Sequence, residues 1–164
     1  MKTAIYPGTF DPITYGHIDV IKKSLTIFDR VVVATTDNVN KNYYFSINER
    51  LDIINNSLFK DLKLNKKKIK VISFNNLTID LCKIYKANAI IRGLRAVSDF
   101  EYEFQLAGMN KKLNSNIETM FLMSDVENQI ISSKFVKEIA SLGGNIDRFV
   151  TKYVAVSYTH LTLP

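Results

Sequence analysis

The residues best placed to do chemistry lie near the start of the chain. The sequence GTFDP at residues 8–12 is followed, after Ile13, by TYGH at residues 14–17. Residues 3–6 form a short apolar strand that Pro7 and Gly8 are expected to end, and a helix is expected to begin near Gly16. Because a helix N-terminus presents free N–H groups to anions, we predict a phosphate cradle that contains the imidazole of His17.

A structural role for His17 is the alternative. A lone histidine in the first turn of a helix commonly makes only a structural hydrogen bond. Gly8, Thr9 and Gly16 surround His17 in the sequence and supply other parts of a phosphate-binding motif. The pattern therefore favours the phosphate-binding role.

Two further groups of cations follow predicted strands. Lys41 lies in the loop of residues 37–44, where a lysine would act as a mobile point charge on a phosphate. Arg92 and Arg95 flank Gly93, which permits a close backbone approach, and arginine binds phosphate oxygens in a bidentate manner. The alternative for the arginines is a surface turn paired with Asp99 or Glu101.

Four other residues have a structural interpretation. For Glu103, one turn into a predicted helix, a salt bridge or a solvated position is favoured by the residues alone. Ser132 and Ser133 offer hydroxyl and N–H groups to a phosphate, or cap a helix, and both can hold together. Cys82 has apolar neighbours at helical spacing and is expected in the core.

The sequence contains no evident nucleophile. We find no serine–histidine–acid set, no cysteine pair and no cluster with metal-ligand spacing. A site of cations and helix dipoles without a base is typical of direct phosphoryl or nucleotidyl transfer. Mg²⁺ would then accompany the nucleotide and not occupy a protein cage.

Strand-like and helix-like segments alternate along the chain. This order predicts an α/β fold, a Rossmann-like, doubly wound, five-stranded parallel sheet with helices on both faces. Ligands of such sheets lie beyond the carboxyl ends of the strands, where Thr9, His17, Lys41, Thr78, Arg92 and Ser132 fall. The expected strands are residues 3–6, 31–34, 70–74, 89–91 and 119–123, and the expected helices are residues 17–28, 46–58, 78–85, 98–113 and 132–142.

Composition limits the remaining choices. A chain of 164 residues with 46% hydrophobic residues predicts one domain, over residues 1–155, followed by an atypical tail at 156–164. No apolar run approaches the roughly 18 residues that cross a bilayer, and one cysteine fits a reducing cytoplasm. The net charge of +6 comes mainly from scattered lysines, and residues 66–68 are expected to be a solvated loop, so neither a membrane nor a nucleic acid is an expected partner.

The motifs taken together resemble a known superfamily. Residues 6–17 resemble the (His/Thr)-x-Gly-His nucleotidyltransferases. Residues 91–103, IRGLRAVSDFEYE, are similar to the bacterial phosphopantetheine adenylyltransferases within it, as are residues 45–50, 121–123 and 131–133. The resemblance covers residues 1 to about 150. It implies a transfer of the adenylyl group of ATP to 4′-phosphopantetheine, which yields dephospho-coenzyme A and pyrophosphate. Another adenylyl- or cytidylyltransferase of the superfamily is the alternative.

The resemblance also implies roles for residues. His17 and Lys41 would be catalytic, and members are typically cytoplasmic homohexamers. Contacts with phosphopantetheine would come from Thr9, Lys41, Thr78 and Arg92. Contacts with ATP would come from Thr9, Phe10, His17, Gly93, Leu94, Arg95, Glu103, Asn128, Gln129, Ile130, Ile131, Ser132, Ser133 and Lys134.

The chain departs from the family pattern in three places. Lys134 stands where a third serine is common, and Asn128 stands where an aromatic residue is common. Residues 156–164 show no helical pattern and resemble translated adapter sequence more than native coding sequence. We therefore expect no functional role for His160.

Overall fold

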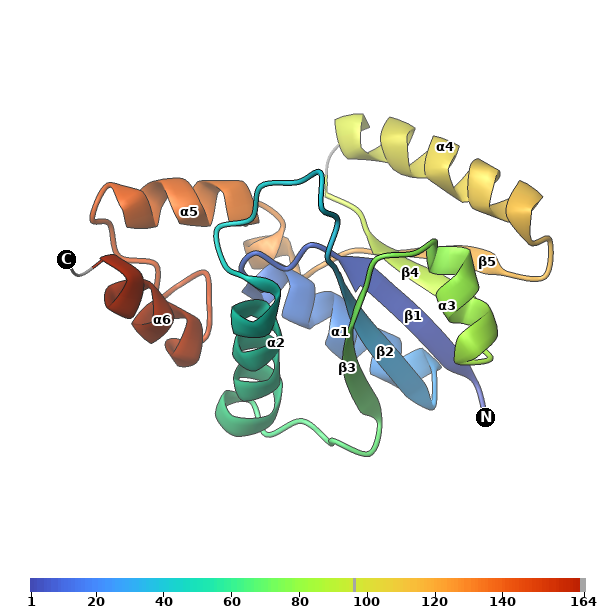
Figure 1. Ribbon diagram of the computed structural model, residues 1–164, viewed down its shortest axis with the longest axis horizontal. Helices are drawn as coiled ribbons and strands as arrows, with labels where there is room; N and C mark the ends of the chain where they lie inside the picture. The colour runs from blue at the N-terminus through green and yellow to red at the C-terminus, as the bar shows by residue number, and fades with distance from the viewer. Residues whose placement is uncertain (96, 163–164) are drawn as a thin grey trace.

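The central element is a five-stranded parallel sheet. The computed structural model describes residues 1–95 and 97–162, with residues 97, 98 and 160–162 described by their backbone alone. Within these residues the strand order is β3-β2-β1-β4-β5 (Figure 1). The predicted α/β fold with one parallel sheet is confirmed. The strands are β1 (Thr3–Gly8), β2 (Arg30–Thr36), β3 (Ile69–Phe74), β4 (Ala89–Gly93) and β5 (Glu118–Leu122).

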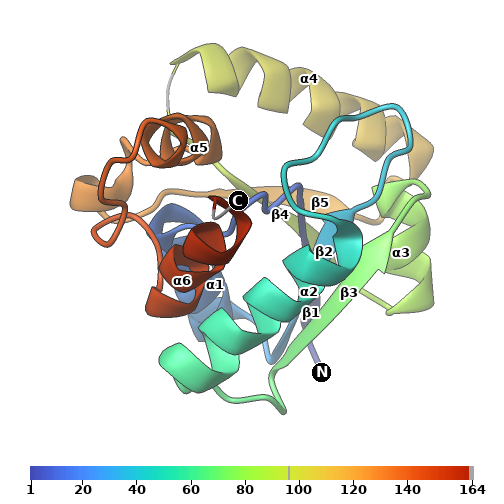
Figure 2. The ribbon, with the colours of Figure 1, turned by 60° about the vertical axis from the view of Figure 1, so that its left-hand side comes forward.

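Helices cover both faces of the sheet, as predicted. In Figures 1 and 2, α4 runs along one side of the sheet and α1 and α2 lie on the other, with α5 and α6 beyond one end. No described helix is long and apolar enough to span a membrane. The helices are α1 (Tyr15–Ile27), α2 (Ile47–Asn55), the π-helical turn η1 (Asn56–Asp61), α3 (Thr78–Ile84), α4 (Val97–Leu113), the 3₁₀ turn η2 (Val126–Asn128), α5 (Ser133–Ser141) and α6 (Lys152–Thr162).

Alternate residues of the central strands pack into two hydrophobic cores, one on each face of the sheet. Ala4 and Tyr6 of β1 pack in the core that includes α1 and α2, whereas Ile5 packs in the core that includes α3. Cys82 belongs to the second core and is 1% exposed, as expected. Burial on both faces explains why the strands are continuous apolar runs without polar alternation.

Helix ends agree well with the sequence signals. Ser46 caps α2, and Glu49 returns the bond to the Ser46 N–H, so the predicted capping box is confirmed. Gly143 ends α5 with φ 79° and the Gly144 N–H donates to Ile139 O, as expected for the Gly-Gly stop. The helix expected to begin at Ser98 begins at Val97, and the Ser98 side chain lies outside the described residues.

Two expectations about the backbone are wrong. Pro7 and Gly8 do not end β1, because both residues pair with β2. The pairing of β1 with β4 stops at Ile5, so the N–H group that Pro7 lacks costs no hydrogen bond to β4. Residues 156–162, expected to lack helical structure, belong to α6. Val154 and Tyr158 are buried one helical turn apart, which is the pattern that drives this helix onto the core.

Candidate functional site

A cleft of about 380 Å³ opens at the carboxyl ends of β1 and β4. These strands are neighbours, and the strand order reverses between them, which is where open α/β sheets bind ligands. The cleft is lined by residues 6–10 at the end of β1, by 14, 16 and 17 at the start of α1, by 92–95 at the end of β4, by 131–134 at the start of α5, and by Val20, Asp99, Glu103 and Ser124. The predicted cluster of residues 9–17, 92–95 and 131–134 is thus brought together.

The floor of the cleft depends on close packing between Gly8 and Phe10. A Cβ on Gly8 would lie 3.0 Å from two carbons of the Phe10 ring. Phe10 itself has a φ of 46°, a left-handed conformation that is strained for a bulky residue. Its ring packs edge-on against His17, with centroids 4.9 Å apart. Gly8 therefore allows Phe10 to hold the His17 ring in place.

His17 is fixed by the cap of its own helix. Thr14 caps α1, and its backbone N–H donates to His17 Nδ1 at 3.0 Å. Because Nδ1 accepts this bond, we assign the ring proton to Nε2. Burial, with a smaller effect from the charge of Arg95, lowers the pKa of His17 to about 4. At neutral pH His17 is thus a neutral donor through Nε2, and its structural bond leaves Nε2 available for the predicted anion-binding role.

The two arginines of residues 92–95 are held differently. Arg92 donates from Nε and Nη2 to both carboxylate oxygens of Glu103 at 2.7 and 2.6 Å. Burial alone would lower the pKa of Arg92, but its hydrogen bonds to Glu103 and the charge of Glu103 raise it. Arg95 donates to Ile131 O at 2.9 Å and lies 3.7 Å from Asp99. The salt bridge favoured for Glu103 is confirmed, with Arg92 as its partner.

The start of α5 forms the opposite wall. Ser132 caps the helix by accepting from the Phe135 N–H at 3.1 Å, and Ser133 donates to Pro12 O at 2.8 Å. Lys134 is exposed and lines the cleft. The first N–H groups of α5 therefore face the same space as those of α1, which gives the cleft two helix N-termini for anions.

Five predicted site residues do not line this cleft: Lys41, Thr78, Asn128, Gln129 and Ile130. Lys41 is exposed in the loop between β2 and α2, and Thr78 is the first residue of α3. Asn128 donates to Asp19 at 2.7 Å, and Gln129 donates to Ser124 O at 3.2 Å. Their roles toward substrates stay predictions.

Two buried charges next to the cleft were not assigned a role from the sequence. Asp11 accepts hydrogen bonds from the Tyr44 and Phe45 N–H groups, and Arg50 is completely buried. Both lie inside motifs that the sequence does display, residues 8–12 and 45–50. For Arg50, the available signal was a charged side chain directly before the apolar Leu51 in a capped helix. The sequence alone did not show what this charge binds.

The cleft carries a strong excess of donors. Arg92, Arg95, Lys134 and two helix N-termini face it, against the carboxylates of Asp99 and Glu103, which already bind the arginines. Among the described residues no group of three histidine, cysteine or acidic side chains could hold a metal ion. The arrangement can hold several phosphate groups and stabilise charge that develops on them.

A parallel sheet of this order with a donor-rich cleft at its switch point is the architecture of nucleotide-binding α/β proteins, and the comparisons with known proteins narrow the class to the nucleotidyltransferases. Residues 5–139 match the family model described as cytidylyltransferase-like. The phosphopantetheine adenylyltransferase of Pelagibacter ubique (strain HTCC1062) is 70% identical over 92% of each chain. The enzyme of the same name from Vesicomyosocius okutanii subsp. Calyptogena okutanii (strain HA) is 46% identical over 97% of this chain and 98% of its own.

Solved structures agree on the fold. A Vibrio parahaemolyticus chain, provisionally assigned as a nicotinate-nucleotide adenylyltransferase, superposes with a TM-score of 0.74 at 20% identity, over 97% of this chain and 99% of that one. The chain described here belongs to the cytidylyltransferase-like family and, within it, to the phosphopantetheine adenylyltransferases.

Proposed function

We propose that this protein transfers the adenylyl group of ATP to 4′-phosphopantetheine, which yields dephospho-coenzyme A and pyrophosphate. The observation that carries the proposal is the 70% identity to a phosphopantetheine adenylyltransferase over 92% of the chain. The cleft supports it, because a reaction between two phosphates needs many donors and no protein nucleophile. Another adenylyl- or cytidylyltransferase of the family is the alternative.

The chemical step is a direct in-line displacement. A phosphate oxygen of phosphopantetheine forms a bond to the α-phosphorus of ATP, while the bond from that phosphorus to the oxygen bridging to the β-phosphate breaks. Pyrophosphate leaves with the bonding electrons, and no covalent enzyme intermediate forms. Neutral His17 would donate from Nε2 to the α-phosphate, and Lys41 would approach from its loop as substrates bind.

The remaining residues would divide between the two substrates. Arg92, oriented by Glu103, would hold the phosphate of phosphopantetheine together with Thr9 and Thr78. The start of α5 and Arg95 would hold the phosphates of ATP. Phe10, residues 93–94 and residues 128–131 would contact the nucleotide.

Mg²⁺ would accompany ATP. The acidic side chains of the cleft, Asp99 and Glu103, are paired with arginines, and no described group of three acidic, histidine or cysteine side chains could form a cage. This donor set fits an ion held mainly by nucleotide oxygens. The ion would neutralise phosphate charge.

We also propose a homohexamer that works in the cytoplasm. Support for assembly comes from α4, which exposes large apolar side chains on more than one side of the helix. Exposed apolar patches of this kind mark protein–protein contacts. The side chains are Phe100, Tyr102, Phe104, Met109 and Leu113.

Pyrophosphate release tests the proposal. The purified protein with ATP and Mg²⁺ is offered phosphopantetheine, nicotinamide mononucleotide and glycerol phosphate in separate reactions. We expect release with phosphopantetheine alone. Release only with another acceptor would identify a different transferase, and binding of nucleic acid without any release would identify a binding protein.

A further inference from the structure

Arg50 is the largest side chain that the core buries completely, with 0% exposed. It lies in the first turn of α2, directly behind the capping box of Ser46 and Glu49. Burial of a guanidinium group is costly unless its N–H donors are hydrogen-bonded, so the hydrogen-bond partners of Arg50 indicate its role.

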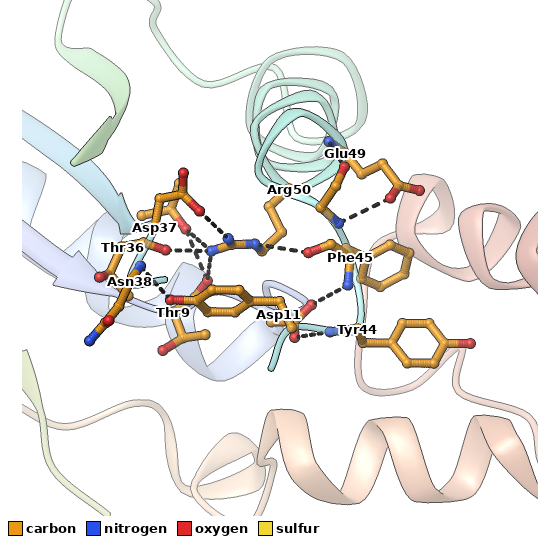
Figure 3. A network of polar contacts seen from close by, with 12 residues as sticks. Thr9, Asp11, Thr36, Asp37, Asn38, Tyr44, Phe45, Glu49 and Arg50 are labelled. Carbon is orange, nitrogen blue, oxygen red and sulfur yellow. Dashed lines mark hydrogen bonds and ion pairs between the residues drawn. The ribbon is translucent and has the colours of Figure 1, made fainter. Parts of the chain in front are cut away.

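The partners of Arg50 are mainly backbone carbonyl groups from three segments. Nη1 donates to Thr9 O at 3.1 Å and Thr36 O at 2.7 Å, and Nε donates to Phe45 O at 3.1 Å (Figure 3). The nearest carboxylate oxygen, on Asp37, is 3.8 Å from Nη2, which has no hydrogen-bond partner in the described structure. Arg50 is thus bound mainly by backbone carbonyl groups and only weakly by a counter-ion.

The contact with Thr9 sets the orientation of the peptide at the floor of the cleft. Thr9 O also accepts from the Thr35 hydroxyl at 2.9 Å, so two donors hold it. The peptide between Thr9 and Phe10 is trans, and therefore the Phe10 N–H is directed away from Arg50. Among the described residues this N–H has no acceptor, although Phe10 lines the cleft.

The other contacts of Arg50 hold together the two ends of the loop that carries Lys41. Thr36 precedes this loop and Phe45 follows it, and Arg50 binds the carbonyl of each. The Asp11 carboxylate accepts from the Tyr44 and Phe45 N–H groups at 2.7 and 2.9 Å. Two buried charges thus tie the loop of residues 37–44 to the Thr9 segment.

We propose that Arg50 is a positioning residue for phosphate chemistry in this cleft. It holds the Thr9 carbonyl so that the Phe10 N–H becomes a hydrogen-bond donor to a phosphate oxygen of the nucleotide, and it fixes the base of the Lys41 loop. The proposal rests on the proposed nucleotidyl transfer. A purely structural Arg50 would affect stability alone.

The test compares two buried threonines. Thr35→Val removes a donor to Thr9 O and an acceptor of Arg50, and it preserves the shape of the side chain. Thr151→Val is the matched control, because it removes the buried hydrogen bond between Thr151 and Ser57, away from the cleft. Both variants are assayed for kcat, KM for ATP and thermal midpoint, at a temperature where both are folded.

We expect similar losses of thermal midpoint but different kinetics. Thr35→Val lowers kcat about tenfold or more because a small misplacement of a phosphate donor is costly. Thr151→Val keeps kcat within about twofold, since its site is untouched. Equal kcat values in the two folded variants would overturn the proposal.

Arg50→Lys provides the second variant. Lysine keeps the charge but cannot span the three carbonyls, so a folded Arg50→Lys should lose at least as much kcat as Thr35→Val. A folded Arg50→Lys with wild-type kcat would also overturn the proposal, and Thr35→Val decides alone if Arg50→Lys does not fold. An inactive wild-type protein would instead contradict the proposed function.

Discussion

The Glu103 carboxylate holds Arg92 through two hydrogen bonds, at 2.7 and 2.6 Å, inside the cleft. Arg92 lies next to the last residue of β4, and Glu103 lies in the second turn of α4, so the pair joins these two elements. Glu103 is 6% exposed. A bidentate pair of this kind fixes the plane of the guanidinium and leaves Nη1, which lies 3.4 Å from Pro7 O, toward the cleft floor.

Glu103→Gln should therefore weaken acceptor binding more than the chemical step. Arg92 would lose its fixed orientation, and we expect the KM for phosphopantetheine to rise about tenfold, with a loss of about 2 kcal/mol in the free energy of unfolding. Steady-state kinetics and urea unfolding measure the two effects. Glu118→Gln, which breaks an exposed pair with Lys111, is the control and should change neither. Equal results for both variants would show that the Arg92 pair has no role in binding.

His17→Ala should reduce kcat with little change in KM. The Nε2–H of His17 is a preorganised neutral donor, and loss of one such donor to developing charge typically costs about a hundredfold in kcat. Rapid-quench measurement of pyrophosphate formation separates this step from product release. A normal kcat would mean that His17 only caps α1.

The depressed pKa of His17 also predicts how stability depends on pH. An unfolded histidine binds a proton near its ordinary pKa of 6.5, whereas folded His17 does so only near 4. Between these values the unfolded state binds more protons, so the contribution of His17, complete above pH 6.5, is lost as the pH falls toward 4. Urea unfolding from pH 7 to 4.5 should show a drop in wild type, at most about 1.4 kcal/mol per pH unit, that is smaller in His17→Ala. Parallel curves for the two proteins would contradict the assignment.

The sequence predicted the parts of the fold that depend on local signals. Ser46 and Glu49 form their capping box because neighbours in the chain decide it, and the alternating order of strands and helices, which predicts a parallel sheet, can also be read along the chain. Helix α6 was missed because its support is tertiary: the Tyr158 ring packs against Phe45, more than a hundred residues away, with centroids 5.1 Å apart. A short amphipathic segment gains most of its helical stability from such packing.

The candidate site also contains parts that local sequence signals predict and parts that they do not. The cradle of residues 8–17 could be predicted because Gly8, His17 and the helix start are contiguous. Arg92 could be placed at the cleft because it ends a strand, but no local pattern distinguished Glu103 as its partner from Asp99 or Glu101. The role of Arg50 depends on carbonyl groups from three separate segments, which a linear sequence does not bring together.

Gly8→Ala should damage activity through the Phe10 ring. The added methyl group would lie 3.0 Å from two ring carbons, and Phe10 packs against His17, so the ring and the imidazole would both shift. We expect kcat to fall at least tenfold and the free energy of unfolding to fall by about 1–3 kcal/mol. Gly108→Ala is the control: nothing lies within 4 Å of its Cβ position in α4, so it should stabilise by up to about 1 kcal/mol with normal kcat. Full activity in Gly8→Ala would show that the Phe10 contact does not position His17.

Lys41 provides the last test, because it is exposed and outside the cleft. Its loop is tied at the base by Arg50 and Asp11, so only the tip is free to bring the ammonium group to a bound phosphate. If Lys41 does this during transfer, Lys41→Ala should lower kcat about tenfold or more without a loss of stability, and an increase in ionic strength should not reproduce the effect. Lys66→Ala, in another exposed loop, should leave kcat unchanged. A kcat within twofold of wild type in Lys41→Ala would place all of the catalytic charge on the residues that already line the cleft.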